Sequence, residues 1–330
     1  MLNLHFVDSQ TGQTYPFDTH AWRGEGGAPL DIAGLTPFDP HRIDPNVWSV
    51  WRYREFLPLP PSTAPVSLGE GMTPLVPVTL DGRTVHYKLE FMSPTGSYKD
   101  RGATTLISGL RAAGVTDLLE DSSGNAGTAV AAYSAAAGIR ARIFVPDHAS
   151  PAKKAQIRVY GAELVEVPGG RAATTDAAIQ AAKTTVYGSH AWNPLFNSGL
   201  RTAAWEVWEQ LRRRAPDAVI TPVGQGGLLL GMVDGFRELK AGGYIARVPR
   251  FYGVQAQAVA PVYEAWRQGR TTVTPAAEGQ TIAEGVRVVN PVRGAAIVAA
   301  VRETGGALLT AADEAVERAR ADLARHGLFV

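Results

Sequence analysis

From Val85 onward, short segments with the composition of β-strands alternate with longer segments of helical periodicity. This alternation constrains the fold most strongly, because strands that alternate with helices typically form parallel α/β units. We predict strands at Val85–Leu89, Asp117–Asp121, Ala141–Val145, Glu163–Val167, Ala218–Val223 and Phe251–Val254. We predict helices at Lys99–Ala113, Asn125–Ala137, Pro151–Tyr160, Thr174–Thr184, Gly199–Arg213, Gly227–Lys240, Ala258–Arg267, Pro291–Arg302 and Ala311–Arg325. The expected fold class is α/β, with mostly parallel sheets.

Composition and charge exclude or disfavour several kinds of binding partner and cellular location. The chain has 330 residues, 45% hydrophobic and 19% charged, which is ordinary for a globular enzyme. A net charge of +1 without a basic block disfavours nucleic acid, and no apolar run is long enough for a membrane span. Cysteine is absent, which excludes disulfides and thiolate metal sites. The first residues lack the pattern of a signal peptide, so we expect a cytoplasmic protein. Because thiolate ligands are missing, we also expect no metal site. The histidines, His190 among them, show no metal-ligand spacing and are expected to be surface or satisfied core residues.

The run Ser93-Pro-Thr-Gly-Ser-Tyr-Lys-Asp-Arg-Gly102 joins a predicted strand to a predicted helix. The strand ends near Glu90, Pro94 and Gly96 predict a tight turn, and Lys99 falls in the first turn of the helix. A cation there opposes the positive end of the helix dipole, which favours chemistry by the free amine. Only six of the 32 basic residues are lysines, and arginine cannot form an imine. Taken alone, however, the run favours a solvated lysine at a capped helix start.

Two small-residue loops also lie between a predicted strand and a predicted helix. The first, Asp121-Ser-Ser-Gly-Asn-Ala-Gly127, would let backbone amides point at an anion, although a plain cap by Ser123 or Asn125 explains it in isolation. The second, Val223-Gly-Gln-Gly-Gly-Leu-Leu-Leu-Gly231, has the position of a phosphate-binding loop. It is neither a dinucleotide fingerprint, because Leu229 replaces the third glycine, nor a P-loop. A chance glycine-rich turn is the alternative.

The run from Ser93 to Gly102 resembles the lysine motif of fold-type II pyridoxal-phosphate (PLP) enzymes. It is most similar to the form in the threonine synthase family, where an aromatic residue precedes the lysine and Asp-Arg-Gly follows. Ser67-Leu-Gly-Glu-Gly-Met-Thr-Pro-Leu75 is similar to another signature of that family. The resemblance covers roughly residues 48–330 and implies a tryptophan synthase β-like architecture of two open α/β domains. It also implies that Lys99 carries PLP as an imine.

The resemblance assigns further roles around Lys99. It implies that Asn125 hydrogen-bonds the 3-hydroxyl of the cofactor. Substrate is expected to bind through its α-carboxylate to Ser122, Ser123 and Ala126. Lys88 is a candidate contact for a substrate phosphate, by its place in the Lys-x-Glu strand of the family.

The glycine-rich loop resembles the phosphate loop of the same family. The residues expected to hold the cofactor phosphate are Val223, Gly224, Gln225, Gly226 and Gly227. This loop is nearer the form in dehydratases than the Gly-Asn-x-Gly-Asn form common in threonine synthases. Glu284 and Gly285 match the family's segment that faces the pyridine ring.

The resemblance also implies a domain division. Thr11–Tyr15 and Glu25–Leu30 resemble the knuckles of a zinc ribbon, but without cysteines they can form only a metal-free remnant. We expect an N-terminal extension at 1–55, a large PLP-binding domain at 56–100 with 192–330, and a small mobile domain at 101–191. The cofactor is expected between the large and the small domain, at the carboxyl ends of strands.

The implied function is that of a PLP-dependent lyase in amino-acid biosynthesis. The first hypothesis is threonine synthase, which converts O-phospho-L-homoserine and water to threonine and phosphate. The alternatives are a serine/threonine dehydratase and a catalytically weak PLP-binding relative. We expect a small-molecule substrate and a homodimer. The chain stops at Gly327-Leu-Phe-Val330, where the family continues into a segment that contacts the pyridine nitrogen, so we expect a truncated chain with weak turnover.

Overall fold

The computed structural model describes residues 4–17, 21–122 and 124–329, and the chain forms two compact units. Unit 1 comprises Met1–Thr73 and Met92–Thr202, and unit 2 comprises Pro74–Phe91 and Ala203–Val330. Both units combine parallel sheets with helices, which confirms the predicted α/β class. Of the helices that these residues form, none has the length and apolar character that a membrane span requires.

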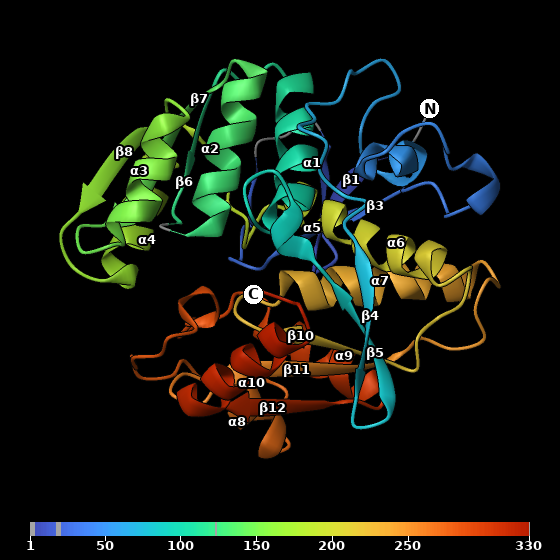
Figure 1. Ribbon diagram of the computed structural model, residues 1–330. Helices are drawn as coiled ribbons and strands as arrows, with labels where there is room; N and C mark the ends of the chain where they lie inside the picture. The colour runs from blue at the N-terminus through green and yellow to red at the C-terminus, as the bar shows by residue number, and fades with distance from the viewer. Residues whose placement is uncertain (1–3, 18–20, 123, 330) are drawn as a thin grey trace. The chain divides into compact units, whose positions relative to one another are not determined.

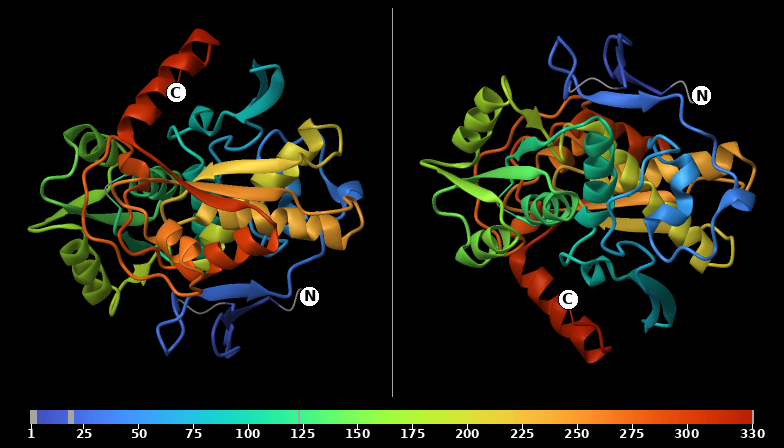
Figure 2. Two further views of the ribbon diagram at one scale, coloured as in Figure 1. Left: turned by 90° about the horizontal axis from the view of Figure 1, so that it is seen from below. Right: turned by 90° about the horizontal axis from the view of Figure 1, so that it is seen from above.

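Unit 1 is built on a four-stranded parallel sheet in the order β8-β7-β6-β9. Its strands are β6 (Asp117–Glu120), β7 (Arg140–Pro146), β8 (Glu163–Val167) and β9 (Val186–Tyr187). Its helices are α1 (Lys99–Ala112), α2 (Asn125–Ala137), α3 (Pro151–Val159), α4 (Arg171–Ala181) and α5 (Pro194–Leu200). Helices lie on both faces of this sheet (Figures 1 and 2).

A three-stranded antiparallel sheet, β2-β1-β3, forms the N-terminal part of unit 1. It comprises β1 (His5–Asp8), β2 (Thr14–Pro16) and β3 (Leu30–Ala33), and two short 3-10 helices follow at Pro40–Arg42 and Val50–Phe56. Phe6 and Leu30 are buried in the core that α1, α2 and α5 also form. Trp22 packs edge-on against Tyr187 and Trp192, with ring centroids 5.0 and 5.3 Å away. The sequence alone showed none of these strands, because each is too short to display a period.

Unit 2 contains a three-stranded parallel sheet in the order β10-β11-β12. The strands are β10 (Ala218–Pro222), β11 (Arg250–Ala256) and β12 (Ala307–Ala311). The helices are α6 (Thr202–Gln210), α7 (Gly227–Ala241), α8 (Pro261–Arg267), α9 (Gly294–Glu303) and α10 (Asp313–Arg325), with α6 beginning at the junction between the units. Short 3-10 helices lie at Glu284–Val286 and, where the chain returns to unit 1, at Glu90–Met92. Phe236 and Phe251 pack against each other in the core of unit 2.

A hairpin departs from the expected parallel pairing. β4 (Leu75–Leu80) and β5 (Arg83–Lys88) are antiparallel and are joined by Asp81 and Gly82. Both turn residues have positive φ values, +47° and +73°, as a tight hairpin turn requires. Leu323 and the buried Leu328 pack against this hairpin, so the end of α10 and the residue Leu328 after it are held on β4 and β5, whereas Phe329 is exposed.

Several element boundaries differ from the predicted ones for local reasons. The helix predicted at Gly199–Arg213 is two helices, α5 and α6, and the first begins earlier, at Pro194. Asn193 caps it by accepting a hydrogen bond from the Leu195 N–H at 3.0 Å, and proline is favoured directly after such a cap. β12 at Ala307–Ala311 was not predicted.

Candidate active site

Lys99 is the first residue of α1, as predicted, and the turn before it is set by Gly96 and Ser97. Gly96 has a φ of +86°, a left-handed conformation that glycine adopts without strain. The hydroxyl of Ser97 accepts a hydrogen bond from the Lys99 backbone N–H at 3.3 Å. The start of the helix, and with it the root of the lysine side chain, is therefore defined by local contacts.

Two buried charged residues directly after Lys99 anchor this helix start. The carboxylate of Asp100 accepts hydrogen bonds from the backbone N–H of Thr95, at 2.7 Å, and from the Thr95 hydroxyl. The guanidinium of Arg101 donates to the hydroxyls of Thr202 and Thr73, at 3.1 and 3.3 Å. Because a buried charge without such partners is costly, these contacts hold the Asp-Arg pair and the loop together.

The amine of Lys99 lies beside aromatic rings. Its Nζ is 4.7 Å from the ring centroid of Tyr98 and 6.0 Å from that of Phe196, both within cation–π range. Phe196 packs so closely on α1 that a Cβ at Gly102 would fall 2.3 Å from its ring. The ring of His190 meets Phe196 edge-on, with centroids 6.0 Å apart. The half-buried amine is therefore flanked by an aromatic wall.

The loop between β6 and α2 is shaped by close backbone approach. Gly124 is the cap residue of α2, and within the described chain it has no side-chain hydrogen bond to the helix. The hydroxyl of Ser122 accepts from the Gly124 N–H at 3.3 Å. A Cβ at Gly127 would lie 1.9 Å from the carbonyl oxygen of Ser122, so glycine is required there. Asn125 follows the cap, so the plain cap explanation does not apply to its side chain.

The side chain of Asn125 contacts a lysine from another helix. Asn125 Oδ1 accepts a hydrogen bond from Lys153 Nζ at 2.8 Å. Lys153 is in the first turn of α3, which follows β7, and it is half-buried. β6 and β7 are parallel, so the segments after their carboxyl ends meet at one edge of the sheet.

A buried acid–histidine pair lies at the same edge. His190 Nδ1 is 2.6 Å from Glu120 Oε1, and the His190 backbone N–H donates to Glu120 Oε2 at 3.2 Å. Burial raises the pKa of Glu120 well above its ordinary value, and the charge of Asp121 adds to this. Burial lowers the pKa of His190 well below its ordinary value, and the charge of Lys99 adds to this. The pair is therefore expected to hold one proton between its two members. The expectation that His190 is a satisfied core residue is borne out by this contact.

Asp121 is the centre of a second buried network beside that pair. Its carboxylate accepts from the hydroxyl of Tyr187 at 2.7 Å, from the hydroxyl of Thr175 at 2.8 Å and from Arg171 at 2.9 Å. These partners come from β9 and α4. The network ties the beginning of the Ser122 loop to two further elements of unit 1.

In unit 2, the glycine-rich loop joins β10 to α7 at the predicted place. Gly226 caps α7 with a φ of +78°, and the described residues provide this cap with no side-chain hydrogen bond. A Cβ at Gly226 would lie 2.2 Å from Ile297 Cδ1, so both its conformation and the space around it favour glycine. Gln225 Oε1 accepts from the Val292 N–H at 3.0 Å, which anchors the loop to the start of the α9 segment.

The segment that carries Glu284 and Gly285 lies against this loop. A Cβ at Gly224 would be 3.3 Å from the Gly285 carbonyl oxygen and 3.2 Å from Val286 Cα. Unit 2 thus brings Gly224 and Gly285 together, although they are distant in the chain. Glu284 is exposed.

Lys88 is engaged in a structural contact within unit 2. Its Nζ lies 2.8 Å from Glu206 Oε2 and 2.9 Å from Gln210 Oε1. Glu206 is fully buried, so removing the lysine would take a charged partner away from a buried carboxylate. This contact supports a structural role for Lys88.

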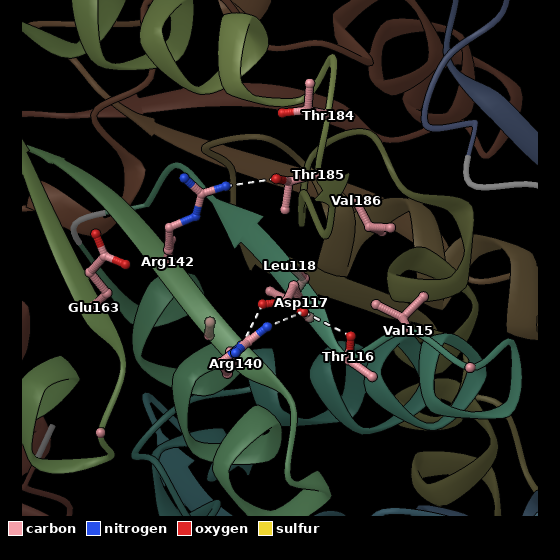
Figure 3. Close-up of a pocket in the computed structure, with 13 residues that line it drawn as sticks. Val115, Thr116, Asp117, Leu118, Arg140, Arg142, Glu163, Thr184, Thr185 and Val186 are labelled. Atoms are coloured by element: carbon pink, nitrogen blue, oxygen red, sulfur yellow. Dashed lines mark hydrogen bonds and ion pairs between the residues drawn. The ribbon is translucent and has the colours of Figure 1, made fainter.

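A surface cavity of about 750 Å³ lies elsewhere in unit 1 (Figure 3). It is lined at the amino ends of the strands, where Arg140 pairs with Asp117 at 2.6 Å and Arg142 donates to Thr185 at 2.7 Å. The Arg140 guanidinium lowers the pKa of Asp117 to about 2. Because Lys153 and Asn125 follow the carboxyl ends of the strands, this cavity is at the other edge of the sheet from them.

Comparison with known proteins decides the family. A family model described as pyridoxal-phosphate dependent enzyme matches residues 66–330. The chain belongs to the pyridoxal-phosphate dependent enzymes. Its cofactor is therefore PLP, as the lysine motif predicted.

Relatives and solved structures refine this membership. The chain is 33% identical to threonine synthase of Methanocaldococcus jannaschii over 97% of this chain and 82% of the relative. It is 33% identical to threonine synthase of Mycobacterium tuberculosis over 90% and 81%. The structure of a T.th. threonine deaminase is similar with a TM-score of 0.63 and 29% identity, covering 77% of this chain and 81% of that one. Maize serine racemase shares the fold, with a TM-score of 0.67, 21% identity and 78% coverage of both chains. The chain is thus a PLP-dependent lyase that is similar to threonine synthase.

The residues of this PLP-dependent enzyme fit the cofactor. Unit 1 supplies an amine at a helix start, and unit 2 supplies a side-chain-free glycine turn at the N-terminus of a long helix, where phosphate binding is favourable. Unit 1 contains Lys99 at the start of α1, and Ser122, Asn125 and the buried Ala126 in or directly after the loop that follows β6, whereas Ser123 lies outside the described residues. The remaining predicted residues, Val223–Gly227 with Glu284 and Gly285, belong to unit 2. Their roles stay predictions.

Three residues of the candidate site in this PLP-dependent enzyme were not predicted from the sequence. They are Lys153, which contacts Asn125; Glu120, which pairs with His190; and Phe196, which flanks Lys99. Lys153 could have been found from the rule that parallel strands present their carboxyl ends at one edge. Glu120 and Phe196 carry no such local signal, because their partners are distant in the chain.

Replacing Glu120 tests the proton held by the buried pair. A raised pKa at Glu120 makes stability fall as pH rises above 4.5, and a lowered pKa at His190 makes stability fall as pH drops below 6.5. Between pH 4.5 and pH 6.5, the contributions of Glu120 and His190 to stability change in opposite directions. Above pH 6.5 the His190 contribution no longer changes, and only the Glu120 contribution depends on pH. Above pH 6.5, the stability of Glu120→Gln in urea unfolding should therefore rise relative to that of the wild type, by up to about 1.4 kcal/mol per pH unit, until the pH passes the raised pKa of Glu120.

The matched control is Glu166→Gln. Hydrogen bonds from Lys154 lower the pKa of Glu166, so this exposed carboxylate does not titrate over the same range. Its stability difference from the wild type should stay constant with pH. Parallel curves for Glu120→Gln and the wild type would refute the shared proton.

Replacing Gly226 tests the glycine turn at α7. Gly226→Ala should destabilise apo-protein by about 1–3 kcal/mol, since it adds strain at positive φ and a contact with Ile297. Gly243→Ala is the control, because Gly243 has a φ of +77° but open space around it. Denaturation that shows equal losses in the two variants would mean that the Ile297 contact contributes nothing.

Proposed function

We propose that Lys99 binds PLP covalently and that three further segments of the chain hold the rest of the cofactor. Asn125 would contact the 3-hydroxyl, and the backbone of Val223–Gly227 would hold the phosphate. Glu284 and Gly285 would lie beside the pyridine ring. This proposal is supported by the lysine at the start of α1, by the glycine-capped turn at α7 and by membership of the PLP family.

The substrate is proposed to bind through its carboxylate at the start of α2. The backbone amides of Ser122, Ser123 and Ala126 would supply donors, and the positive end of the helix favours an anion there. Gly127 supports this role, because it allows α2 to begin close against the Ser122 carbonyl. The cofactor, when bound, supplies an electron sink for the substrate. Lys99 would move the proton at Nζ, as a general base and then as an acid.

The reaction proposed is that of threonine synthase, with O-phospho-L-homoserine and water as substrates. The observation that carries this proposal is 33% identity to threonine synthase over 97% of the chain. Lys88 is the candidate contact for a substrate phosphate, although its pairing with Glu206 supports a structural role.

Deamination of serine or threonine is the second candidate function. It is favoured by Gln225-Gly226-Gly227, which resembles the dehydratase form of the phosphate loop, and by the similarity to the T.th. threonine deaminase. The aromatic wall of Tyr98 and Phe196 beside the Lys99 amine is compatible with a small uncharged side chain on the substrate.

We also propose the division into an N-terminal extension at 1–55, a large domain at 56–100 with 192–330 and a small domain at 101–191. The sheet β8-β7-β6-β9 lies wholly within the small-domain residues, which supports this division. Hydrogen exchange should then show 101–191 opening as one cooperative unit. Exchange in which α1 and α5 open together as a separate unit would contradict it.

The proposed assembly is a homodimer in the cytoplasm. The family resemblance supports this proposal. The net charge of +1 is compatible with it, because a chain with little net charge does not repel a second copy strongly. Light scattering on the holoenzyme should give twice the mass of the chain, whereas a monomer mass at all concentrations would contradict the dimer.

Mapping the cofactor tests the assignment of Lys99. Borohydride reduction of holoenzyme should place the pyridoxyl group on the peptide that contains Lys99. Lys99→Ala should lose the visible absorbance of the bound cofactor, with less than about 1 kcal/mol change in stability, because the side chain is half-buried and not part of the core. Label on Lys153 or Lys88 would show that another amine carries PLP.

Parallel product assays separate the two candidate reactions. Holoenzyme should release inorganic phosphate from O-phospho-L-homoserine and form threonine in equal amount. It should release little ammonia from serine or threonine by comparison, with a ratio of kcat/KM values above about 100 in favour of the phosphorylated substrate. Efficient serine deamination without phosphate release would reverse this ranking and establish the dehydratase.

A further inference from the structure

We propose that Lys153 is a positioning residue that sets which end of the Asn125 amide faces the cofactor. The contact is direct, with Lys153 Nζ donating to Asn125 Oδ1 at 2.8 Å. The two residues come from different helices, α3 and α2, and each lies in the first turn of its helix. The inference rests on the proposed function, in which Asn125 contacts the 3-hydroxyl oxygen of PLP.

The argument follows from the hydrogen-bonding capacity of the two groups. An amide side chain has an accepting oxygen and a donating nitrogen on opposite branches, and the two orientations have nearly the same shape. A lysine ammonium can only donate, so it can pair only with the oxygen. Lys153 therefore selects the orientation in which Asn125 Nδ2 points away from the Lys153 ammonium. That branch is the donor that an anionic 3-oxygen requires.

The neighbourhood of Asn125 explains why such selection is needed. Gly124 is the cap residue of α2, so the Asn125 side chain is not held by capping its own helix. The preceding Ser122 hydroxyl accepts from Gly124 rather than from the amide. Among the described residues, no hydrogen bond other than that of Lys153 fixes the Asn125 amide, so without the lysine the amide could rotate and present its oxygen to the cofactor. Two facing oxygens repel each other, which would weaken cofactor binding.

The next residue in the chain, Lys154, offers a matched control. Its Nζ lies 2.7 Å from Glu166 Oε2 and also contacts the Asp147 carbonyl, so it ties α3 to β8 and to the loop after β7. Lys153 and Lys154 share a helix, a charge and a side-chain length. They differ in whether the ammonium reaches Asn125.

The test compares PLP binding and absorbance in three variants of the whole chain. Lys153→Met should weaken the affinity for PLP about tenfold and shift the visible absorption maximum of bound cofactor, because one charged hydrogen bond and the amide orientation are lost. Lys153→Arg should recover most of the affinity and the wild-type spectrum, since arginine also only donates. Lys154→Met should leave both properties unchanged. The melting temperature of apo-protein should be the same in Lys153→Met and the wild type within about 2 °C, because the lost contact is half-exposed.

A double-mutant cycle separates this inference from the proposed function. If Lys153 acts through Asn125, adding Lys153→Met to Asn125→Ala should change the PLP affinity by less than about twofold. Equal effects of Lys153→Met in both backgrounds would overturn the positioning role. An unaltered spectrum and affinity in Lys153→Met, together with a clear loss in Asn125→Ala, would also overturn it while leaving the function of Asn125 intact. If Asn125→Ala itself binds PLP like the wild type, the proposed role of Asn125 fails.

Discussion

The candidate site of unit 1 depends on two buried charged residues that directly follow Lys99 in the chain. Asp100 and Arg101 are fully buried, and each is satisfied by threonine side chains or backbone of a different segment. Since an unpaired charge in this position would cost several kcal/mol, the loop before α1 and the ends of segments far along the chain are held in one arrangement. The neighbours of Lys99 in the chain thus serve stability, and its amine, beside the aromatic wall, can serve chemistry.

The second organising constraint is the direction of the strands in the β8-β7-β6-β9 sheet. All four strands are parallel, so every segment that follows a strand begins at the same edge. That edge gathers Asn125, Lys153, Asp121 and the Glu120–His190 pair. The opposite edge holds the cavity of Figure 3, where the exposed Arg140–Asp117 pair is screened by water and contributes little to stability. One sheet thus separates a buried polar network from a solvated ion pair.

Glycine residues allow other atoms to approach the backbone more closely than a residue with a side chain would permit. Gly127 lets α2 begin directly against the Ser122 carbonyl, and Gly226 turns the chain into α7 at positive φ. In both loops the helix cap is a glycine rather than a side chain that would consume the first amides. Among the described residues, no side chain caps the first turn of either helix, and free amides at a helix start favour an anion such as a phosphate or a carboxylate.

Features that depend on a few neighbouring residues could be predicted before the structure was known. The sequence located the first residues of α1, α2 and α7, the α/β class and the PLP motif, because turns, glycines and helix starts depend on a few neighbouring residues. The antiparallel β4–β5 hairpin and the N-terminal sheet were not predicted, because their strands are too short to show a period. The division between α5 and α6 was also not predicted, because the Asn193 cap starts α5 before the periodic pattern begins. Only the tertiary structure joined Lys153 to Asn125 and Glu120 to His190. Those pairs lie 28 and 70 residues apart, and the order of strands in the sheet, rather than any local propensity, brings them into contact.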